Sequence, residues 1–262
     1  MYFLFLPAMN AKFYPELMKK IYTLLFALVI IQTSFAQEKP KNSIGGRPNI
    51  PSDLVFEFGF NQLNNRPEDM GLSFFDSRTF NVYFQHPFKI FGEESGITFN
   101  PGFGVGSDKY AFKDPQNLVN NPLLGTESSE MVDLTEIYGD DIRIKTNSLA
   151  VNYFDIPLDF VYHLNKTNHS KGFRFSIGAK VGILYEAHTK NKFKDADGLK
   201  RKVKDSQNYG LEKIRYGLTF KAGSPGFYTW FYYGLNSTFQ AGKGPYGTAA
   251  SQLNFGVAVN VF

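Results

Sequence analysis

The residues of this chain that could do chemistry are few and scattered. The four histidines are His86, His163, His169 and His188. None of them stands in a spacing typical of a Ser-His-Asp triad or of a histidine-rich metal site. His188 lies close to Glu186 and Thr189, a grouping that would suit a membrane hydrolase, but a polar histidine at the end of a strand is the simpler interpretation. We therefore predict no enzyme activity, no catalytic residue, no cofactor and no metal site.

One acidic turn has part of the spacing of a calcium loop. Asp195, Asp197 and Gly198 match its first positions, but the remaining ligands and the closing glutamate are missing. The Asp197-Gly198 pair is instead typical of a tight hairpin turn. We therefore predict that the segments on either side of this turn pair as strands.

The segment around that turn is rich in cations, and the longest gap between predicted strands is rich in acids. The cations are Lys190, Lys192, Lys194, Lys200, Arg201, Lys202 and Lys204. The acids are Glu127, Glu130, Asp133, Glu136, Asp140 and Asp141. A charged run of this kind is often just a solvated face, and phosphate binding is the functional alternative. The opposite charges also suggest that the two segments pack against each other, an attraction that salt would weaken.

The element that must position these residues is a long strand, Gly172 to His188. Its apolar side chains share one parity, and only Leu184 breaks the alternation. A period of two over about fifteen residues indicates a strand with two unlike faces. Such a strand is about 50 Å long and, tilted by 45°, about 35 Å tall, enough to cross the roughly 30 Å hydrocarbon core of a bilayer.

Seven further segments alternate in a similar way. They begin near Asp53, Arg78, Ile97, Phe154, Lys213, Phe227 and Leu253. The parity of the segment Phe227 to Thr238 is open, because both of its faces are aromatic. Short connections near Gly92–Gly96, Asn165–Lys171 and Gly223–Gly226 alternate with longer ones. We therefore predict an all-β fold: an eight-stranded antiparallel up-and-down transmembrane β-barrel over residues 53–262, with long extracellular loops and both termini periplasmic.

Alternation alone does not say whether the apolar face meets lipid or lines a cavity. A secreted lipocalin-like barrel that binds a ligand in an apolar cavity is the alternative. The polar face is packed with glycine, which suits a crowded barrel interior better than a solvated surface. The apolar face carries almost no charge, and a lipid-facing Arg or Lys would cost roughly 2–4 kcal/mol. We therefore predict that the apolar face is in contact with lipid.

The same parity places a set of charged side chains in the lumen. These are Glu57, Asp155, Asp159, Lys180, Glu186, Arg215 and Lys221. An eight-stranded barrel has an interior that side chains fill, and buried opposite charges should pair there. We interpret the set as a structural plug. The alternative is a gated path for protons or ions.

The N-terminal segment has the features of a secretory leader. A basic Met18-Lys19-Lys20 precedes the apolar run Ile21 to Ile31, and small residues follow at Ser34 and Ala36. We predict a leader over residues 1–36, with translation starting at Met18 and cleavage after Ala36. Residues 37–52, rich in proline, glycine and charge, are interpreted as a periplasmic linker.

Several short strings resemble the PorT-like outer-membrane β-barrel family across residues 53–262. They are Asn100 to Gly106, Phe154 to Leu158, Gly178 to Gly182, Tyr233 to Asn236 and the terminal Phe262. The resemblance implies an eight-stranded outer-membrane barrel and a possible link to type IX secretion. The last strand departs from the usual barrel-assembly signal, because its apolar residues are out of phase with Phe262.

These observations favour a non-enzymatic, monomeric outer-membrane barrel of a Gram-negative cell, with a structural, assembly or surface-interaction role. A secretion-accessory role like that of PorT is one version, and a lipid-active hydrolase is the alternative from another class. The expected partners are outer-membrane lipid, lipopolysaccharide phosphates at the lysine-rich segment, and an unidentified membrane or secretion-system protein. We expect no nucleic-acid partner.

Overall fold

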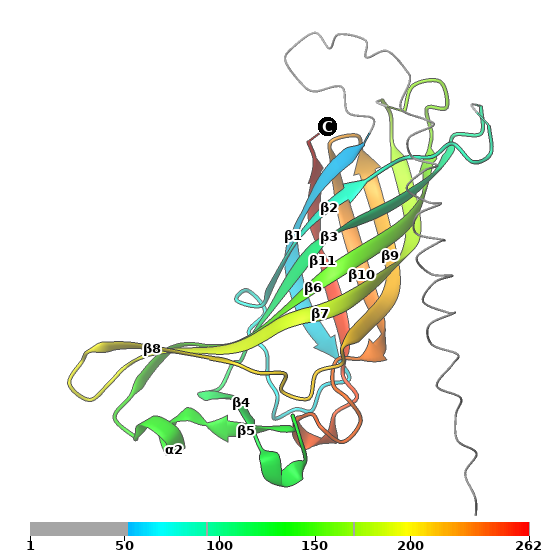
Figure 1. Ribbon diagram of the computed structural model, residues 1–262. Coiled ribbons are helices and arrows are strands. Elements are labelled where there is room, and N and C mark those ends of the chain that lie inside the picture. The colour runs from blue at the N-terminus through cyan, green and yellow to red at the C-terminus, as the bar shows by residue number, and fades with distance from the viewer. Residues whose placement is uncertain (1–51, 93, 170, 262) are drawn as a thin grey trace, which may run out of the picture. The chain divides into compact units, whose positions relative to one another are not determined.

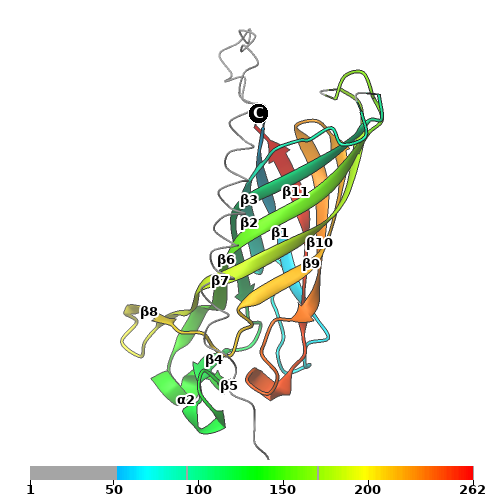
Figure 2. The same ribbon diagram turned by 45° about the vertical axis from the view of Figure 1, so that its right-hand side comes forward.

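The computed structural model describes residues 52–92, 94–169 and 171–261, and these form a closed antiparallel β-barrel (Figures 1 and 2). The predicted leader, all but the last residue of the predicted linker, and Phe262 lie outside the described residues. The barrel strands are β1 (Asp53–Asn64), β2 (Arg78–Gln85), β3 (Ile97–Ala111), β6 (Arg143–His163), β7 (Arg174–Lys194), β9 (Ile214–Ser224), β10 (Phe227–Ser237) and β11 (Ser251–Asn260). Neighbours pair in the order β6-β3-β2-β1-β11-β10-β9-β7, and pairing of β6 with β7 closes the ring. The predicted eight-stranded barrel is confirmed.

The two ends of the barrel differ in the length of their connections. Short turns join β2 to β3, β6 to β7 and β9 to β10 at one end, here called the turn end. Longer segments join β1 to β2, β3 to β6, β7 to β9 and β10 to β11 at the other, here called the loop end. Because antiparallel neighbours connected in sequence alternate in direction, all four long connections lie together (Figure 1).

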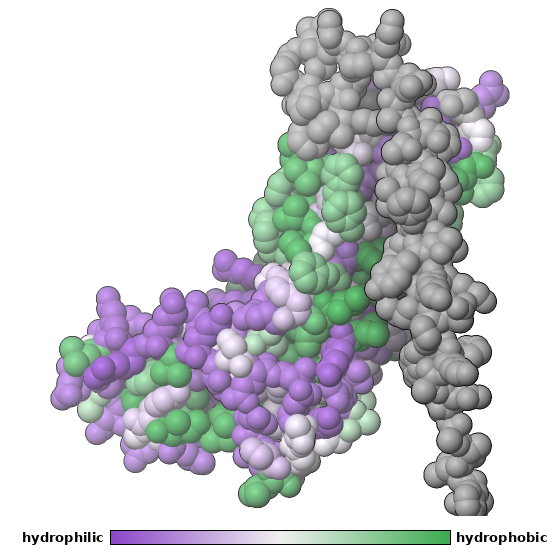
Figure 3. Space-filling view, in the orientation of Figure 1, coloured by the Kyte–Doolittle hydropathy of each residue, from purple (hydrophilic) through white to green (hydrophobic). Residues whose placement is uncertain are grey.

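The predicted apolar faces point out of the barrel. Ile177 is 65% exposed, whereas its neighbour Ser176 is buried. The structure also assigns the parity that the sequence left open: Tyr228, Trp230 and Tyr232 of β10 point inward. In the space-filling view, apolar residues gather on the barrel wall, and hydrophilic ones predominate at the loop end, with smaller apolar patches among them (Figure 3). An outward apolar face contradicts the lipocalin-like alternative, in which that face would line a cavity.

The loop end carries a small lobe of its own. It contains β4 (Gln116–Asn120) paired with β5 (Ser129–Asp133), and the short helix α2 (Leu134–Tyr138). The Asp133 side chain caps this helix by accepting a hydrogen bond from the Thr135 amide at 2.8 Å. Strands β7 and β8 (Lys200–Ser206) form the predicted hairpin, which projects sideways from the barrel (Figure 1).

A bulge in β7 changes which residues face inward. The pairing with β6 shifts between Asn152–Glu186 and Tyr153–Leu184, so that Tyr185 is the extra residue. A bulge reverses the alternation beyond it. Ala187 is therefore buried, although the sequence pattern placed it on the lipid face. Leu184, which broke the predicted alternation, packs on the buried core at this point.

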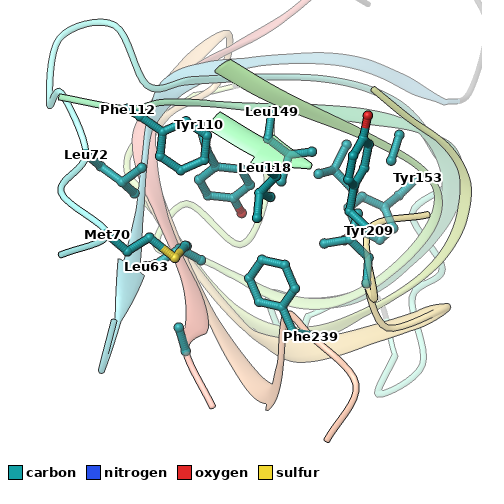
Figure 4. Packing of buried hydrophobic residues seen from close by; sticks show 14 residues of the cluster. Leu63, Met70, Leu72, Tyr110, Phe112, Leu118, Leu149, Tyr153, Tyr209 and Phe239 are labelled. Carbon is teal, nitrogen blue, oxygen red and sulfur yellow. The ribbon is translucent and has the colours of Figure 1, made fainter. Parts of the chain in front are cut away.

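The loop-end opening is filled by an apolar cluster, here called the cap core (Figure 4). Its members come from the loop-end parts of the barrel strands and from the connections, and they include Leu63, Met70, Leu72, Tyr110, Phe112, Leu118, Leu149, Tyr153, Tyr209, Leu211 and Phe239. Leu118 belongs to β4, so the lobe is anchored in the barrel mouth by apolar burial.

No helix among the described residues is long and apolar enough to cross a membrane.

Candidate functional site

Charged side chains fill the barrel lumen between the cap core and the turn end. Nearest the turn end, Lys221 Nζ lies 2.9 Å from Glu57 Oε1 and 3.0 Å from Asp159 Oδ2. Asp159 also accepts hydrogen bonds from Gln85 Nε2 at 2.8 Å and Thr219 Oγ1 at 2.7 Å. One buried cation thus bridges two carboxylates, which lowers the cost of burying all three charges.

Nearer the loop end, Arg215 holds two other carboxylates. Its guanidinium donates to Asp155 through Nε at 3.1 Å and Nη2 at 2.6 Å, and to Asp108 Oδ2 through Nη1 at 2.5 Å. Its Cζ lies 3.9 Å from the centre of the Tyr153 ring. The planar guanidinium therefore satisfies two acids and stacks on an aromatic face, a combination that lysine does not offer.

Lys180 lies between these two clusters and is bound differently. Its Nζ donates to the Tyr83 hydroxyl at 3.2 Å and lies 4.2 Å from the centre of the Tyr232 ring. The Tyr83 hydroxyl in turn donates to Asp155 Oδ2 at 2.8 Å. The Tyr83 hydroxyl therefore bridges Lys180 to the Asp155 carboxylate, and the cation–π contact with Tyr232 also stabilises the lysine charge.

Six of the seven lumen residues predicted from parity lie in this network, and Glu186 does not. Because the Tyr185 bulge reverses the alternation, Glu186 is part-exposed and interacts with Asn152, His188 and Lys204 near the loop end. The predicted lumen position of Glu186 is therefore wrong.

Asp108 is the charged member of the network that sequence reasoning missed. It is fully buried, with one oxygen on Arg215 and the other accepting from Asn254 Nδ2 at 2.9 Å. It continues the Gly102, Gly104, Gly106 parity by one more step in β3. Extending that alternation would have found it.

The lumen network leaves little free space. Two cavities border it among the described residues, one near the turn end and one near the loop end, and they measure about 20 and 10 Å³. Such volumes hold about one water each. Glycines make room for the side chains: a Cβ at Gly182 would lie 2.8 Å from Arg215 Nε. The inward glycines of the sequence therefore mark places where bulky lumen groups reach the wall.

The lysine-rich hairpin has two distinct faces. Direct cross-strand partners are Lys190 with Lys204, Lys192 with Lys202 and Lys194 with Lys200. These six lysines are here called the lysine face. Beyond the bulge they lie on the same side of the sheet as the outward-facing side chains of the barrel wall. Burial, followed by the charges of the neighbouring lysines, lowers the pKa of Lys190. Like charges placed directly opposite one another repel, so this face favours a bound anion.

Arg201, the seventh predicted cation, lies on the other face and closes the hairpin. Its Nε donates to Asp195 Oδ2 at 2.8 Å, and the Leu199 amide donates to Asp195 Oδ1 at 2.8 Å. The hydrogen bond from Arg201 is the main reason that the pKa of Asp195 is lowered. Both carboxylate oxygens of Asp195 are thus used by the turn itself rather than directed at a shared ligand.

The acidic segment packs against the hairpin without ion pairs between the described residues of the two. The contacts are a hydrogen bond of 2.5 Å from Asn117 Nδ2 to Asn191 Oδ1 and a stack of Tyr138 on Phe193 with centres 4.5 Å apart. Packing of the two segments, as the sequence suggested, is therefore present, but amide and aromatic groups provide it rather than opposite charges.

The histidine that the sequence analysis singled out has a simple environment. His188 Nδ1 lies 2.7 Å from Glu186 Oε1, and Lys204 Nζ reaches the same oxygen at 3.2 Å. Thr189 is buried on the opposite face, with its hydroxyl 3.0 Å from the Tyr209 hydroxyl. His188 and Thr189 therefore do not form a base–nucleophile pair in this geometry.

Fold and interior together define a class: an integral membrane β-barrel whose lumen is filled by its own side chains. Comparison with known families agrees, because the model of the outer membrane protein beta-barrel domain matches residues 35–240. The chain belongs to this family, and it is an integral outer-membrane barrel protein. No curated protein matches the sequence. One solved chain, titled "Asymmetric conductivity of engineered proteins", is 10% identical and covers 80% of this chain and 99% of its own length, at a TM-score of 0.19. A similarity that low carries no argument.

Proposed function

We propose that the protein is a non-enzymatic, non-conducting and monomeric outer-membrane barrel that presents the loop-end lobe and hairpin at the cell surface. Its role is structural, in assembly, or in surface interaction. The loop end faces outward and both termini are periplasmic, after removal of the leader. This orientation is supported by the long connections and hydrophilic surface at the loop end, since surface loops of such barrels are longer than periplasmic turns.

The filled lumen is the observation that supports a non-conducting barrel. Arg215 and Lys221 each link two wall carboxylates, and the cap core closes the loop-end mouth of the barrel. An ion that entered would need to displace these buried pairs, at a cost of several kcal/mol each.

Reconstitution of the mature, full-length protein into planar bilayers tests this proposal. We expect no stepwise current up to high applied voltage, and an open porin inserted under the same conditions provides the positive control. Reproducible unit currents from the protein would overturn the plug interpretation and favour a gated ion path.

The proposed partner of the lysine face is lipopolysaccharide. The hairpin leaves the barrel sideways at the loop end (Figure 1). Its six lysines lie on the face that continues the outer wall, and in the proposed orientation this end faces the outer leaflet. Clustered lysines at a membrane surface attract anionic head groups by about 1 kcal/mol each.

The secretion-accessory role implied by the PorT-like resemblance is a narrower version of the same proposal. It is tested by affinity purification from detergent-solubilised outer membrane, with a control chain in which Gln116–Asp133 is replaced by a short Gly-Ser linker. We expect a partner that is retained by the natural chain and lost from the control. Equal recovery from both would count against a lobe-mediated partner and leave the non-conducting barrel in place.

The non-enzymatic assignment has its own test. Purified protein is incubated with radiolabelled phospholipid and with lipopolysaccharide, alongside a His188→Ala variant. We expect no release of fatty acid from either. Turnover that is present in the natural chain and absent from the variant would establish the hydrolase instead.

A further inference from the structure

An apolar groove lies on the outer wall of the barrel, where β1 and β11 meet next to β2. It has a volume of about 640 Å³ and is lined by the aromatic side chains of Phe58, Phe60, Phe75 and Phe80, together with Val257. Phe58 and Phe80 contact each other across strands, with ring centres 4.9 Å apart. Phe75 comes from the β1–β2 connection, which folds back onto the wall and has its ring 6.1 Å from that of Phe60.

Two glycines of the wall border the groove. Gly59 and Gly256 are direct partners on β1 and β11, and both line it. A Cβ on Gly256 would lie 2.5 Å from the Cα of Gly59, so only two glycines permit this close approach of the strands. Both glycines have the inward parity of Glu57 and Ala258, so the hollow on the outer wall lies between the outward side chains on either side of this pair, such as Phe58.

Two cations lie at the loop-end side of the same groove. Arg78 and Lys109 line it and are direct cross-strand partners on β2 and β3. Side chains in that relationship have Cβ atoms about 5 Å apart, and like charges so placed repel. The guanidinium of Arg78 donates through Nε to the Phe75 carbonyl at 2.9 Å, which leaves its terminal nitrogens to other partners. Within the described part of the chain, no carboxylate forms an ion pair with either cation.

The two cations lie next to the apolar band of the wall, on its loop-end side. Phe80 follows Arg78 on the same face of β2, and Val105 precedes Lys109 on the same face of β3 with only Ser107 between them. Across β6 the hairpin is near, because Lys109 pairs with Ala150 and Lys190 pairs with Ser148, two residues away on the same strand. The order along the wall is thus apolar groove, then paired cations, then the lysine face.

We propose that this groove, with Arg78 and Lys109, is a binding site for one phosphorylated glycolipid of the lipid A type: an acyl chain occupies the groove, and a phosphate bridges the two cations. A dianionic phosphate between the cations would relieve their repulsion and accept charge-assisted hydrogen bonds from both. The site deepens the proposed lipopolysaccharide contact and rests on the proposed orientation, in which the loop end faces the outer leaflet.

The test measures lipid retained by the purified, full-length barrel in detergent, by native mass spectrometry during titration with three probes. The probes are bisphosphorylated lipid A, monophosphorylated lipid A and phosphatidylglycerol. For the natural chain we expect one lipid A bound at low probe concentration. Monophosphorylated lipid A keeps one dianionic phosphate to bridge the two cations and should bind about as well. Binding of phosphatidylglycerol, whose phosphodiester carries a single charge, should be at least about tenfold weaker, since one lost charge-assisted contact corresponds to about that factor.

Variants separate the two halves of the site. Arg78→Gln with Lys109→Gln should weaken lipid A binding by about tenfold or more. Arg78→Lys with Lys109→Arg keeps both charges and should retain most of the binding. Val257→Trp fills the groove without changing charge and should also weaken it. The matched control, Lys166→Gln with Lys171→Gln, removes two cations at the turn end and should bind like the natural chain.

Each result has a definite meaning. Unchanged lipid A binding by the double glutamine variant, with folding verified by circular dichroism, would overturn the site. Equal binding of phosphatidylglycerol would overturn the assignment to a glycolipid. Failure of the lipid site would not contradict the non-conducting barrel, because conductance is measured independently. Unit currents would contradict the non-conducting barrel without affecting lipid retention.

Discussion

Arg215 and Asp155 form a bidentate pair at the centre of the barrel, with N–O distances of 3.1 and 2.6 Å. They lie 60 residues apart in sequence, on β9 and β6, and neither strand is the other's neighbour in the sheet. The pair therefore crosses the lumen rather than lying along the wall. With Asp108 on β3 it ties three strands together through the interior.

Removing Arg215 should be the most damaging single change in the lumen. Arg215→Met leaves Asp108 and Asp155 buried without their cation, which should lower the free energy of unfolding by about 3–5 kcal/mol. Urea titration in detergent, followed by circular dichroism, measures the change. Arg201→Gln is the matched control because it breaks the exposed pair with Asp195, and it should leave stability nearly unchanged, since water and salt screen an exposed ion pair. Similar effects of the two substitutions would contradict the buried network.

Lys180→Ala should destabilise the barrel without opening it. The substitution removes a hydrogen bond to Tyr83 and a cation–π contact with Tyr232, and it leaves a cavity enclosed by the remaining side chains. We expect a lower unfolding temperature and no current in a planar bilayer. Ion current from this variant would show that one side chain, rather than the whole network and the cap core, blocks the lumen.

Single cysteines can report the orientation of the barrel, because the natural chain has none. Asp197→Cys lies at the tip of the hairpin, and Lys171→Cys lies in a short turn at the other end. A membrane-impermeant maleimide should label Asp197→Cys in intact cells and Lys171→Cys only after the outer membrane is permeabilised. The reverse pattern would invert the proposed topology.

The same chemistry tests the effect of the bulge on Glu186. Glu186→Cys should react readily with the maleimide in purified protein because Glu186 is part-exposed, whereas Lys180→Cys should react only after unfolding. Equal protection of the two would mean that Glu186 does lie in the lumen, as simple alternation predicts.

Phe193→Ala should loosen the lobe and leave the barrel intact. The Phe193 ring is buried against Tyr138 of α2, and its loss removes the aromatic contact between hairpin and lobe. We expect faster proteolytic cleavage between β4 and α2, with the barrel itself still protected. Phe175→Ala, which truncates an outward-facing ring on the same strand, is the control and should not alter cleavage of the lobe.

The sequence by itself determined the eight strands and which side chains of each strand share a face. The reason is local: a period of two places every second side chain on the same face, whatever the strand pairs with. It also determined six members of the lumen network, since Lys221 and Asp159, for example, need only correct parity to point inward.

Only the tertiary structure decided the position of the bulge and the contacts across the barrel, which the alternation of residues does not specify. The pairing of β6 with β7 creates the Tyr185 bulge, which moves Glu186 out of the lumen and brings Ala187 in. Which carboxylate Arg215 meets depends on contacts across the barrel, and Leu118 reaches the cap core because a 31-residue connection folds back into the mouth. Both depend on closure of the sheet into a ring, a long-range event that no stretch of alternating residues specifies alone.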